Sequence, residues 1–235
     1  MKDPNLTLLE GAVRLLQPLL DELVFAGGCA TGLLITDPAA GGIRPTKDVD
    51  TITEVASYAE YATLSDRLRA LGLSEDHSED APTCRWRYQD LIIDVMPTDE
   101  RVLGFSNRWY APAISSAGHM DIAGLHIRLI TPTYFLATKL EAFRGRGNND
   151  YSGSHDLEDV ITVIDGRPEI IGEVRTAPAD VRTYIASEVR QLLSIRVFVD
   201  ALPGFLLPDS ASQARQPLLL ERLRTLSASG SGQGQ

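Results

Sequence analysis

The chain has 235 residues, of which 43% are hydrophobic and 23% are charged, and its net charge at neutral pH is −10. This length and composition are typical of a globular protein with one large domain or two small ones. The negative charge disfavours broad, non-specific binding to nucleic acid. Apolar runs stay shorter than the roughly 20 residues that a membrane helix needs, and the first residues lack the apolar stretch of a signal peptide. We therefore expect a cytoplasmic protein without membrane contact.

The hydrophobic pattern predicts strands mainly in the first half of the chain. The first expected helix runs from Asp3 to about Asp21, with Pro18 kinking it or lying near its end. Further helices are expected at 29–35 and 56–71, with loops at 36–45 and 74–82. The expected strands lie at 23–26, 48–52, 83–88, 91–96 and 126–130. A two-residue turn, Gln89 and Asp90, joins the third and fourth of these strands into a hairpin.

The second half of the chain predicts helices, at 131–143, 154–164, 178–199 and 213–226. A strand-rich part followed by helices is an α+β layout. We expect a core domain over 1–130 and a helical C-terminal subdomain over 131–226. The last residues, 227–235, are all Ser, Ala, Gly and Gln, a composition that predicts a disordered tail.

Two carboxylates, Asp48 and Asp50, lie one residue apart in a β-branched run. In an extended strand they point to the same face, while Val49 and Ile52 are expected to point into the core. Two carboxylates on one face repel each other unless a cation lies between them. A divalent ion held by oxygen ligands, with Mg²⁺ the usual choice beside phosphates, is the simplest such cation. The alternative is that both are loop residues with capping roles.

Two further features belong with this pair. Gly27 and Gly28 precede a short helix, and a glycine turn at a helix N-terminus lets backbone N–H groups hold a phosphate. Asp94 interrupts an apolar strand, where a carboxylate is costly to bury unless it is paired or metal-bound. The alternative for Asp94 is a lone carboxylate satisfied by backbone donors. The pattern favours metal-assisted phosphoryl or nucleotidyl transfer.

These motifs resemble the DNA-polymerase-β-like nucleotidyltransferase superfamily: Gly-Gly, a helix, Arg44-x-Thr46-x-Asp48-x-Asp50, and the later strand aspartate Asp94. Within it the chain looks most like the toxin-like AbiEii/MenT nucleotidyltransferases. Their later helices carry a Lys, an Arg and Asp-x-x-Asp, matched here by Lys139, Arg144 or Arg146, and Asp156 to Asp159. The resemblance covers about residues 20–165 and implies a mixed sheet flanked by helices. Gly28 departs from the pattern, because many members have Ser there.

The resemblance implies a role for each matching residue. Asp48, Asp50 and Asp94 would bind Mg²⁺ or Mn²⁺ and act in catalysis together with Lys139, and Asp94 would lie near the acceptor hydroxyl. The implied nucleotide-binding residues are Gly27, Gly28, Thr46, Lys139, Arg144 and Asp156. Lys139 has an alternative interpretation as a solvated helix residue. The Asp156–Asp159 pair has two as well: orienting Lys139 or an arginine, or serving as first-turn acids favoured by the helix dipole.

Two clusters mix cations with aromatic side chains: Arg85, Trp86 and Arg87, then Arg108, Trp109 and Tyr110. Such clusters can stack a base or bind a phosphate backbone. For the first cluster, the pattern also fits a half-exposed strand with Trp86 pointing inward. That structural interpretation is the one we favour for Trp86.

We expect an enzyme that transfers a nucleoside monophosphate from an NTP to an acceptor hydroxyl. If the AbiEii/MenT resemblance extends to activity, the acceptor is the 3′ end of tRNA, and the protein is a toxin with a cognate antitoxin. One alternative is the same chemistry on a small hydroxylated acceptor, as in aminoglycoside nucleotidyltransferases. Another is a nucleotide-binding module without turnover.

Overall fold

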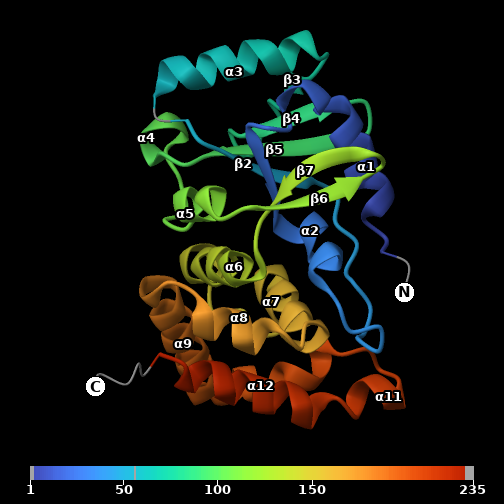
Figure 1. The fold of residues 1–235 in the computed structure, drawn as a ribbon, viewed down its shortest axis with the longest axis vertical. Coiled ribbons are helices and arrows are strands. Elements are labelled where there is room, and N and C mark those ends of the chain that lie inside the picture. The colour runs from blue at the N-terminus through green and yellow to red at the C-terminus, as the bar shows by residue number, and fades with distance from the viewer. Residues whose placement is uncertain (1–2, 56, 231–235) are drawn as a thin grey trace. The chain divides into compact units, whose positions relative to one another are not determined.

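A computed structural model describes residues 3–55 and 57–230 of the chain. Its contacts divide the chain into two compact units (Figure 1). The sheet unit comprises Lys2–Ala30 and Arg44–Thr131, and the helical unit comprises Thr31–Ile43 and Pro132–Gln235. Helix α2, Gly27–Leu34, begins in the sheet unit and ends in the helical one. The break after Thr131 thus leaves the 31–43 segment with the later helices.

The sheet unit contains a seven-stranded sheet in the order β3-β4-β5-β2-β1-β7-β6. Its strands are β1 Leu23–Ala26, β2 Val49–Thr53, β3 Ser74–Glu75, β4 Arg85–Tyr88, β5 Leu91–Pro97, β6 Gly118–Ile122 and β7 Leu125–Leu129. The pairs β2–β5 and β1–β7 are parallel, and the other four pairs are antiparallel. The expected mixed sheet is therefore confirmed.

Helices flank this sheet, as expected. They are α1 Leu6–Leu15, α3 Tyr58–Ala70, α4 Glu100–Leu103 and α5 Tyr110–Ser115, with a 3₁₀ turn at Gln17–Leu19. Helix α1 packs against β5, β2 and β7, and α5 packs against β2. The apolar side chains of the central strands are fully buried between them: Leu23, Val24, Phe25, Val49, Ile52, Ile93 and Val95.

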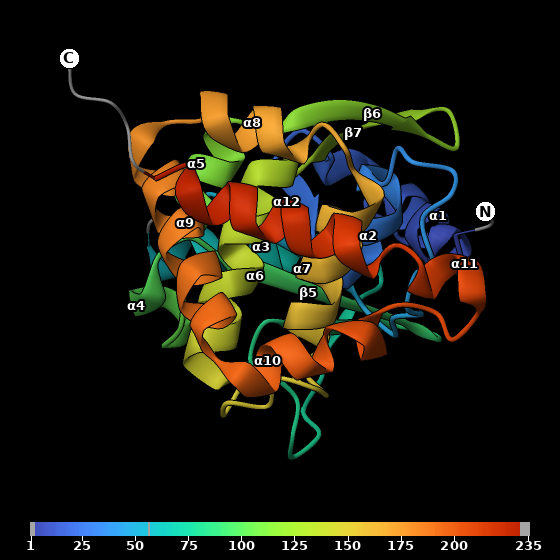
Figure 2. The ribbon, with the colours of Figure 1, turned by 90° about the horizontal axis from the view of Figure 1, so that it is seen from below.

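The helical unit confirms the expected helical C-terminal part. Its helices are α6 Pro132–Arg146, α7 His155–Gly166, α8 Ile170–Thr176, α9 Ala179–Ser194, α10 Arg196–Ala201, α11 Ser210–Gln213 and α12 Gln216–Ala228, with a 3₁₀ turn at Leu202–Phe205. Helix α12 packs along α9 and α7, and α6 packs on α7 and α9 (Figure 2). The predicted disordered tail, 227–235, begins inside α12, and its residues 231–235 lie outside the described part of the chain.

Two predicted helices end earlier than expected. The first ends at Leu15, and Pro18 lies in the 3₁₀ turn that follows, because proline has no N–H to continue the helix. The predicted helix over 178–199 is two helices, since Ile195 is extended, with φ −96° and ψ 110°. Several elements were not predicted, among them β3, α4, the edge strand β6 and helix α8, because each is too short to give a clear periodic pattern.

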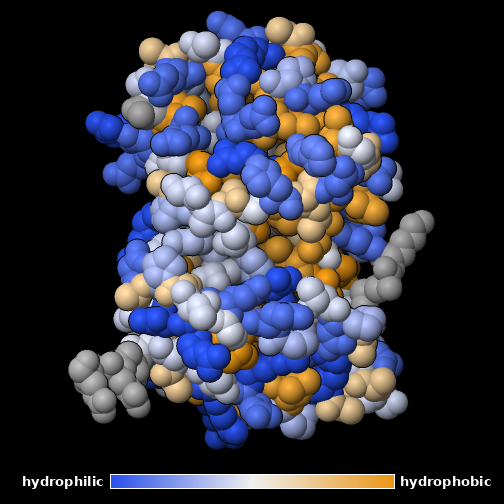
Figure 3. Space-filling view, viewed as in Figure 1, coloured by the Kyte–Doolittle hydropathy of each residue, from blue (hydrophilic) through white to orange (hydrophobic). Residues whose placement is uncertain are grey.

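The face drawn in Figure 3 carries charged and polar residues together with apolar ones. Within the described ranges the large apolar side chains that stand well exposed are Tyr58, Val197, Leu207 and Leu218. None of the helices in those ranges combines the length and the apolar character needed to cross a bilayer.

The central strand β5 offers a test of the packing. Ile93→Ala should lower the free energy of unfolding by about 2–5 kcal/mol, because the side chain is fully buried and the substitution leaves a cavity. Its neighbour Ile92 is only half-buried, so Ile92→Ala should cost clearly less. Urea unfolding of both variants measures the difference. Equal losses would contradict the described orientation of β5.

Candidate functional site

Three aspartates lie on two neighbouring strands of the sheet unit. Asp48 immediately precedes β2, Asp50 lies in β2, and Asp94 lies in β5. Because β2 and β5 are parallel, their register pairs Asp50 directly with Asp94. Asp94 is 6% exposed, so it is a buried carboxylate in an apolar strand. The structure thus brings together the three carboxylates that the sequence singles out. We call Asp48, Asp50 and Asp94 the carboxylate cluster.

Arg85, in β4, supplies the positive charge at this cluster. Its Nε donates to Asp94 Oδ1, and one terminal nitrogen donates to both Asp94 Oδ2 and Asp48 Oδ2, each at 2.8 Å. These hydrogen bonds and the nearby negative charges raise the pKa of Arg85 above its usual range, although burial alone opposes this. The lone, backbone-satisfied carboxylate considered for Asp94 is therefore wrong. Its carboxylate is held by a guanidinium.

The loop before β2 is held in place by hydrogen bonds. Thr46 Oγ1 donates to Asp48 Oδ1 at 2.8 Å, and the Thr46 backbone N–H donates to Asn5 Oδ1 at 2.8 Å. Asn5 Nδ2 in turn donates to the carbonyl of Arg44 at 3.0 Å. Thr46, predicted to bind nucleotide, here orients the carboxylate of Asp48.

Gly27 is required for two separate reasons. Its φ is +64°, a conformation that L side chains rarely adopt. In addition, a Cβ at this position would stand 1.6 Å from Oδ2 of Asp50. The Gly27–Gly28 turn at the start of α2 therefore approaches the Asp50 carboxylate more closely than any other residue type would allow.

The chemistry of this donor set fits a divalent ion. Carboxylate oxygens are the ligands that Mg²⁺ and Mn²⁺ prefer, and Asp48, Asp50 and Asp94 supply them from adjacent strands. In the conformation described, though, no three acidic, His or Cys side chains among the described residues converge closely enough to hold a metal. Arg85 neutralises Asp48 and Asp94 instead. Cys84 contributes no thiolate, because burial first, and then the charges of Asp94 and Asp50, raise its pKa to about 12.

The helical unit holds a second charged group, the lysine cluster of Lys139, Arg146, Asp156 and Asp159. Lys139 Nζ in α6 lies 3.1 Å from Asp156 Oδ1 and 2.7 Å from Asp159 Oδ2, both in α7. Arg146, the last residue of α6, donates through Nε to Asp156 Oδ2 at 3.0 Å. Lys139 is only 9% exposed, so its interpretation as a solvated helix residue is wrong.

Opposing effects act on Asp156. Burial by itself raises its pKa, but the charge of Lys139 and the hydrogen bond from Arg146 outweigh burial, so the net pKa is lowered. Asp156 and Asp159 therefore orient Lys139, as one of the two interpretations expected. Arg144 lies apart from this cluster, because its guanidinium pairs with Glu188 at 2.7 Å.

Apart from Arg85, members of the two cation–aromatic clusters make contacts within the sheet unit that do not involve the three aspartates. Trp86 is 1% exposed, which confirms that it points inward. Arg87 pairs with Asp76 at 2.7 Å. Arg108 stacks over the ring of Trp109 at 5.3 Å from its centroid, and Tyr110 donates its hydroxyl to Met96 Sδ at 3.0 Å.

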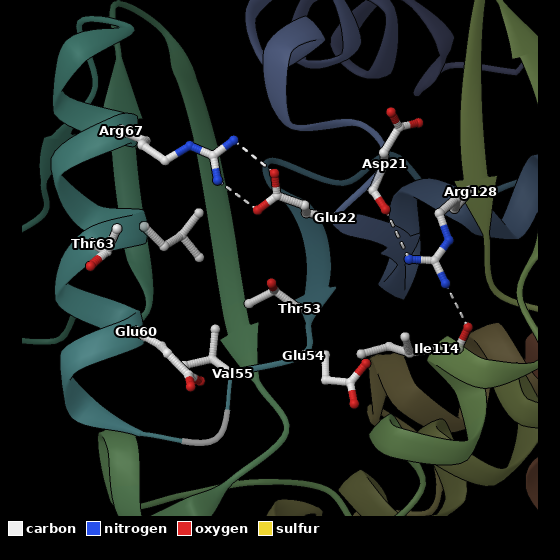
Figure 4. A pocket seen from close by; sticks show the side chains of 11 residues that line it. Asp21, Glu22, Thr53, Glu54, Val55, Glu60, Thr63, Arg67, Ile114 and Arg128 are labelled. Carbon is white, nitrogen blue, oxygen red and sulfur yellow. Dashed lines mark hydrogen bonds and ion pairs between the residues drawn. The ribbon is translucent and has the colours of Figure 1, made fainter.

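Two cavities open on the sheet unit. One, of about 510 Å³, has Arg85 in its wall together with the acidic residues Asp66, Glu75 and Asp76. The other, of about 470 Å³, is lined by Asp21, Glu22, Glu54 and Glu60 but by none of the carboxylate cluster. Figure 4 shows two arginines in the wall of this second cavity. Arg67 forms two hydrogen bonds to Glu22, and Arg128 donates to the carbonyls of Asp21 and Ile114.

Arg85 is not among the site residues predicted from the sequence. The predicted two-residue turn at Gln89 and Asp90 already sets the hairpin register, in which Tyr88 faces Leu91. Counting back along both strands places Arg85 opposite Asp94, which is the pairing observed. The length of the turn was therefore sufficient to predict that Arg85 faces Asp94.

No family model and no curated protein matches the sequence. Among solved structures, the chain is similar to an antigenic nucleotidyltransferase-like protein from Paracoccidioides brasiliensis, with 20% identity, a TM-score of 0.49, and coverage of 88% of this chain and 95% of that one. It is also similar to JHP933 from Helicobacter pylori, with 14% identity, a TM-score of 0.46, and coverage of 98% and 91%. At these identities and scores, neither likeness shows a family or an activity for this chain.

Gly27→Ala tests the close approach to Asp50. An alanine held at positive φ costs about 1–2 kcal/mol of stability. The clash of its Cβ with Asp50 should cost about 1–3 kcal/mol more. Gly104→Ala is the matched control, because Gly104 also has positive φ, at +81°, but nothing lies within 4 Å of its added Cβ. Urea unfolding should show a clearly larger loss for Gly27→Ala. Equal losses would mean that Asp50 does not approach Gly27 as described.

Lys139→Met tests the lysine cluster through pH. The wild-type pKa of Asp156 is lowered, so its stabilising contribution is present above the ordinary aspartate pKa of 3.8 and is lost as the pH falls through the lower folded pKa. In the variant, the charge of Lys139 no longer opposes burial of Asp156, so we expect a loss of about 3–5 kcal/mol at pH 7 that shrinks as acid protonates Asp156. Unfolding free energies measured from pH 7 to pH 4 give this profile. A loss independent of pH would contradict the pairing.

Proposed function

We propose that the protein is a cytoplasmic, Mg²⁺-dependent nucleotidyltransferase that transfers a nucleoside monophosphate from an NTP to an acceptor hydroxyl. The observation that carries this proposal is the meeting of Asp48, Asp50 and Asp94 on β2 and β5, beside the glycine turn that opens α2. Carboxylates on adjacent strands, with Asp50 beside the N-terminus of α2, form a donor set suited to a divalent ion and a phosphate. The nucleotidyltransferase resemblance of the motifs points to the same chemistry.

In the reaction, the acceptor oxygen forms a bond to the α-phosphorus, and the bond from that phosphorus to the bridging oxygen breaks, which releases pyrophosphate. A divalent ion held by Asp48, Asp50 and Asp94 would neutralise charge on the attacking and leaving oxygens. Asp94 would accept the proton of the acceptor hydroxyl. Thr46 keeps Asp48 oriented, and the backbone N–H groups that follow Gly27 and Gly28 would bind phosphate oxygens.

The remaining nucleotide-binding roles fall to the helical unit. For Lys139 we propose a charge-balancing role toward the triphosphate, with Asp156 as its positioning residue. Arg144 is the more accessible cation, since its side chain is 54% exposed, against 11% for that of Lys139. Both residues thus remain proposed phosphate ligands, and Lys139 would have to share its charge with two carboxylates.

For the acceptor, the AbiEii/MenT resemblance favours the 3′ end of tRNA, which would make the protein a toxin held in check by an antitoxin. A small hydroxylated amine is the second candidate acceptor. The cavity beside Arg85 does not decide between the two, because Arg69 pairs with Asp66 and Glu75 in its wall, and Arg87 pairs with Asp76. A binding module without turnover is the third candidate.

The test is to incubate the purified protein with each labelled NTP, Mg²⁺, and either total RNA or a panel of hydroxylated amines. Asp48→Ala should lower the rate by at least about 100-fold, by loss of a charge-stabilising group. Asp90→Ala, in the exposed hairpin turn, is the matched control and should retain activity. Label in a tRNA-sized band supports the RNA acceptor, and label in an amine supports the small one. NTP binding without any labelled product contradicts the enzyme and leaves the binding module.

A further inference from the structure

We propose that Arg85 is a gate for divalent ions: it neutralises the carboxylate cluster until a metal displaces it, and so sets the metal concentration at which the site fills. This proposal rests on the proposed function, because it concerns the same site. The new element is that a residue of the chain itself competes with the metal for the carboxylates. Arg85 thereby becomes a positioning residue of the carboxylates.

The contacts of Arg85 are those of a counter-ion placed by the fold. Its guanidinium binds Asp94 through two parallel hydrogen bonds and reaches Asp48 with the same terminal nitrogen, all at 2.8 Å. Planar two-pronged pairing of this kind is geometrically specific and stronger than neutral hydrogen bonding. The β4–β5 register fixes Arg85 opposite Asp94, so the pairing does not depend on a mobile loop.

Arg85 and a metal ion would compete for the same oxygens. The guanidinium engages three of the four carboxylate oxygens of Asp94 and Asp48, and a cation at these oxygens repels a second cation. In the conformation described, the acidic side chains do not converge as metal ligands, which is the expected result of Arg85 holding two of them. Metal binding must therefore displace the guanidinium at least from Asp48.

The fold provides somewhere for the displaced side chain to go. Arg85 lines the cavity of about 510 Å³, and the acidic residues Asp66, Glu75 and Asp76 lie in the same wall. Arg69 pairs with Asp66 and Glu75, and Arg87 pairs with Asp76, so a displaced guanidinium would share these carboxylates with the arginines already bound to them. It would enter a polar space and would not be buried without a polar partner.

The experiment measures metal affinity directly, without activity. Mn²⁺ is titrated into the metal-free protein, and free Mn²⁺ is followed by electron paramagnetic resonance, for the wild type, Arg85→Gln and Arg87→Gln. Arg87 is the matched control, because it lies in the same strand and pairs with Asp76, a carboxylate outside the cluster. We expect Arg85→Gln to lower the Kd for Mn²⁺ about tenfold, the equivalent of one charge-assisted hydrogen bond, and Arg87→Gln to leave it unchanged.

Arg85→Lys covers the case in which Arg85→Gln does not fold. It keeps the positive charge but loses the planar fork, and it should give a Kd between those of the wild type and the Gln variant. Equal Kd values in wild type and both Arg85 variants would overturn the gate and leave the proposed function standing. No Mn²⁺ binding in any folded variant would overturn the metal site itself, and with it the proposed function. Binding by the Arg85 variants alone would support the gate in its strongest form.

Discussion

The structure of the sheet unit depends on accommodating three negatively charged side chains close to one another. The parallel register of β2 and β5 sets Asp50 against Asp94, and the loop before β2 adds Asp48. Such an arrangement is destabilising unless a cation is present, because solvent and salt screen the repulsion between neighbouring carboxylates poorly in a partly buried site. The positions of Arg85 in β4, of Thr46 and of Gly27 all follow from accommodating these carboxylates.

The helical unit meets the same constraint with a different cation. Asp156 and Asp159 lie on one face of α7 and are nearly fully buried, and Lys139 of α6 lies between them. A buried ion pair of this kind adds little net stability compared with an apolar contact, but breaking it is costly. Each unit therefore contains a charged group whose geometry is fixed by its partners.

Periodicity and turn chemistry were sufficient for much of the fold. Strand 23–26 is observed as predicted, and the turn at Gln89 set the hairpin that carries Asp94. Edge strands were harder to predict: β6 is mostly exposed, and its alternation of polar and apolar residues over 119–122 is too short to distinguish it from a loop. For the site, the aspartates were evident from spacing, whereas the ion pairs of Lys139 depend on how α6 packs on α7, which no local pattern encodes.

If the carboxylate cluster binds a metal, as we propose, Arg85 also explains how such a site and a stable sheet can coexist in one chain. If the carboxylates relied on a divalent ion alone, folding of the central strands would require that ion, as it does in structural metal sites. Because Arg85 already neutralises Asp48 and Asp94, the strands can form without metal. On the same proposal, metal binding would carry a free-energy cost, since the incoming ion would have to replace a contact that the fold has already made. Stability without metal and weaker metal affinity would then both result from the same three hydrogen bonds.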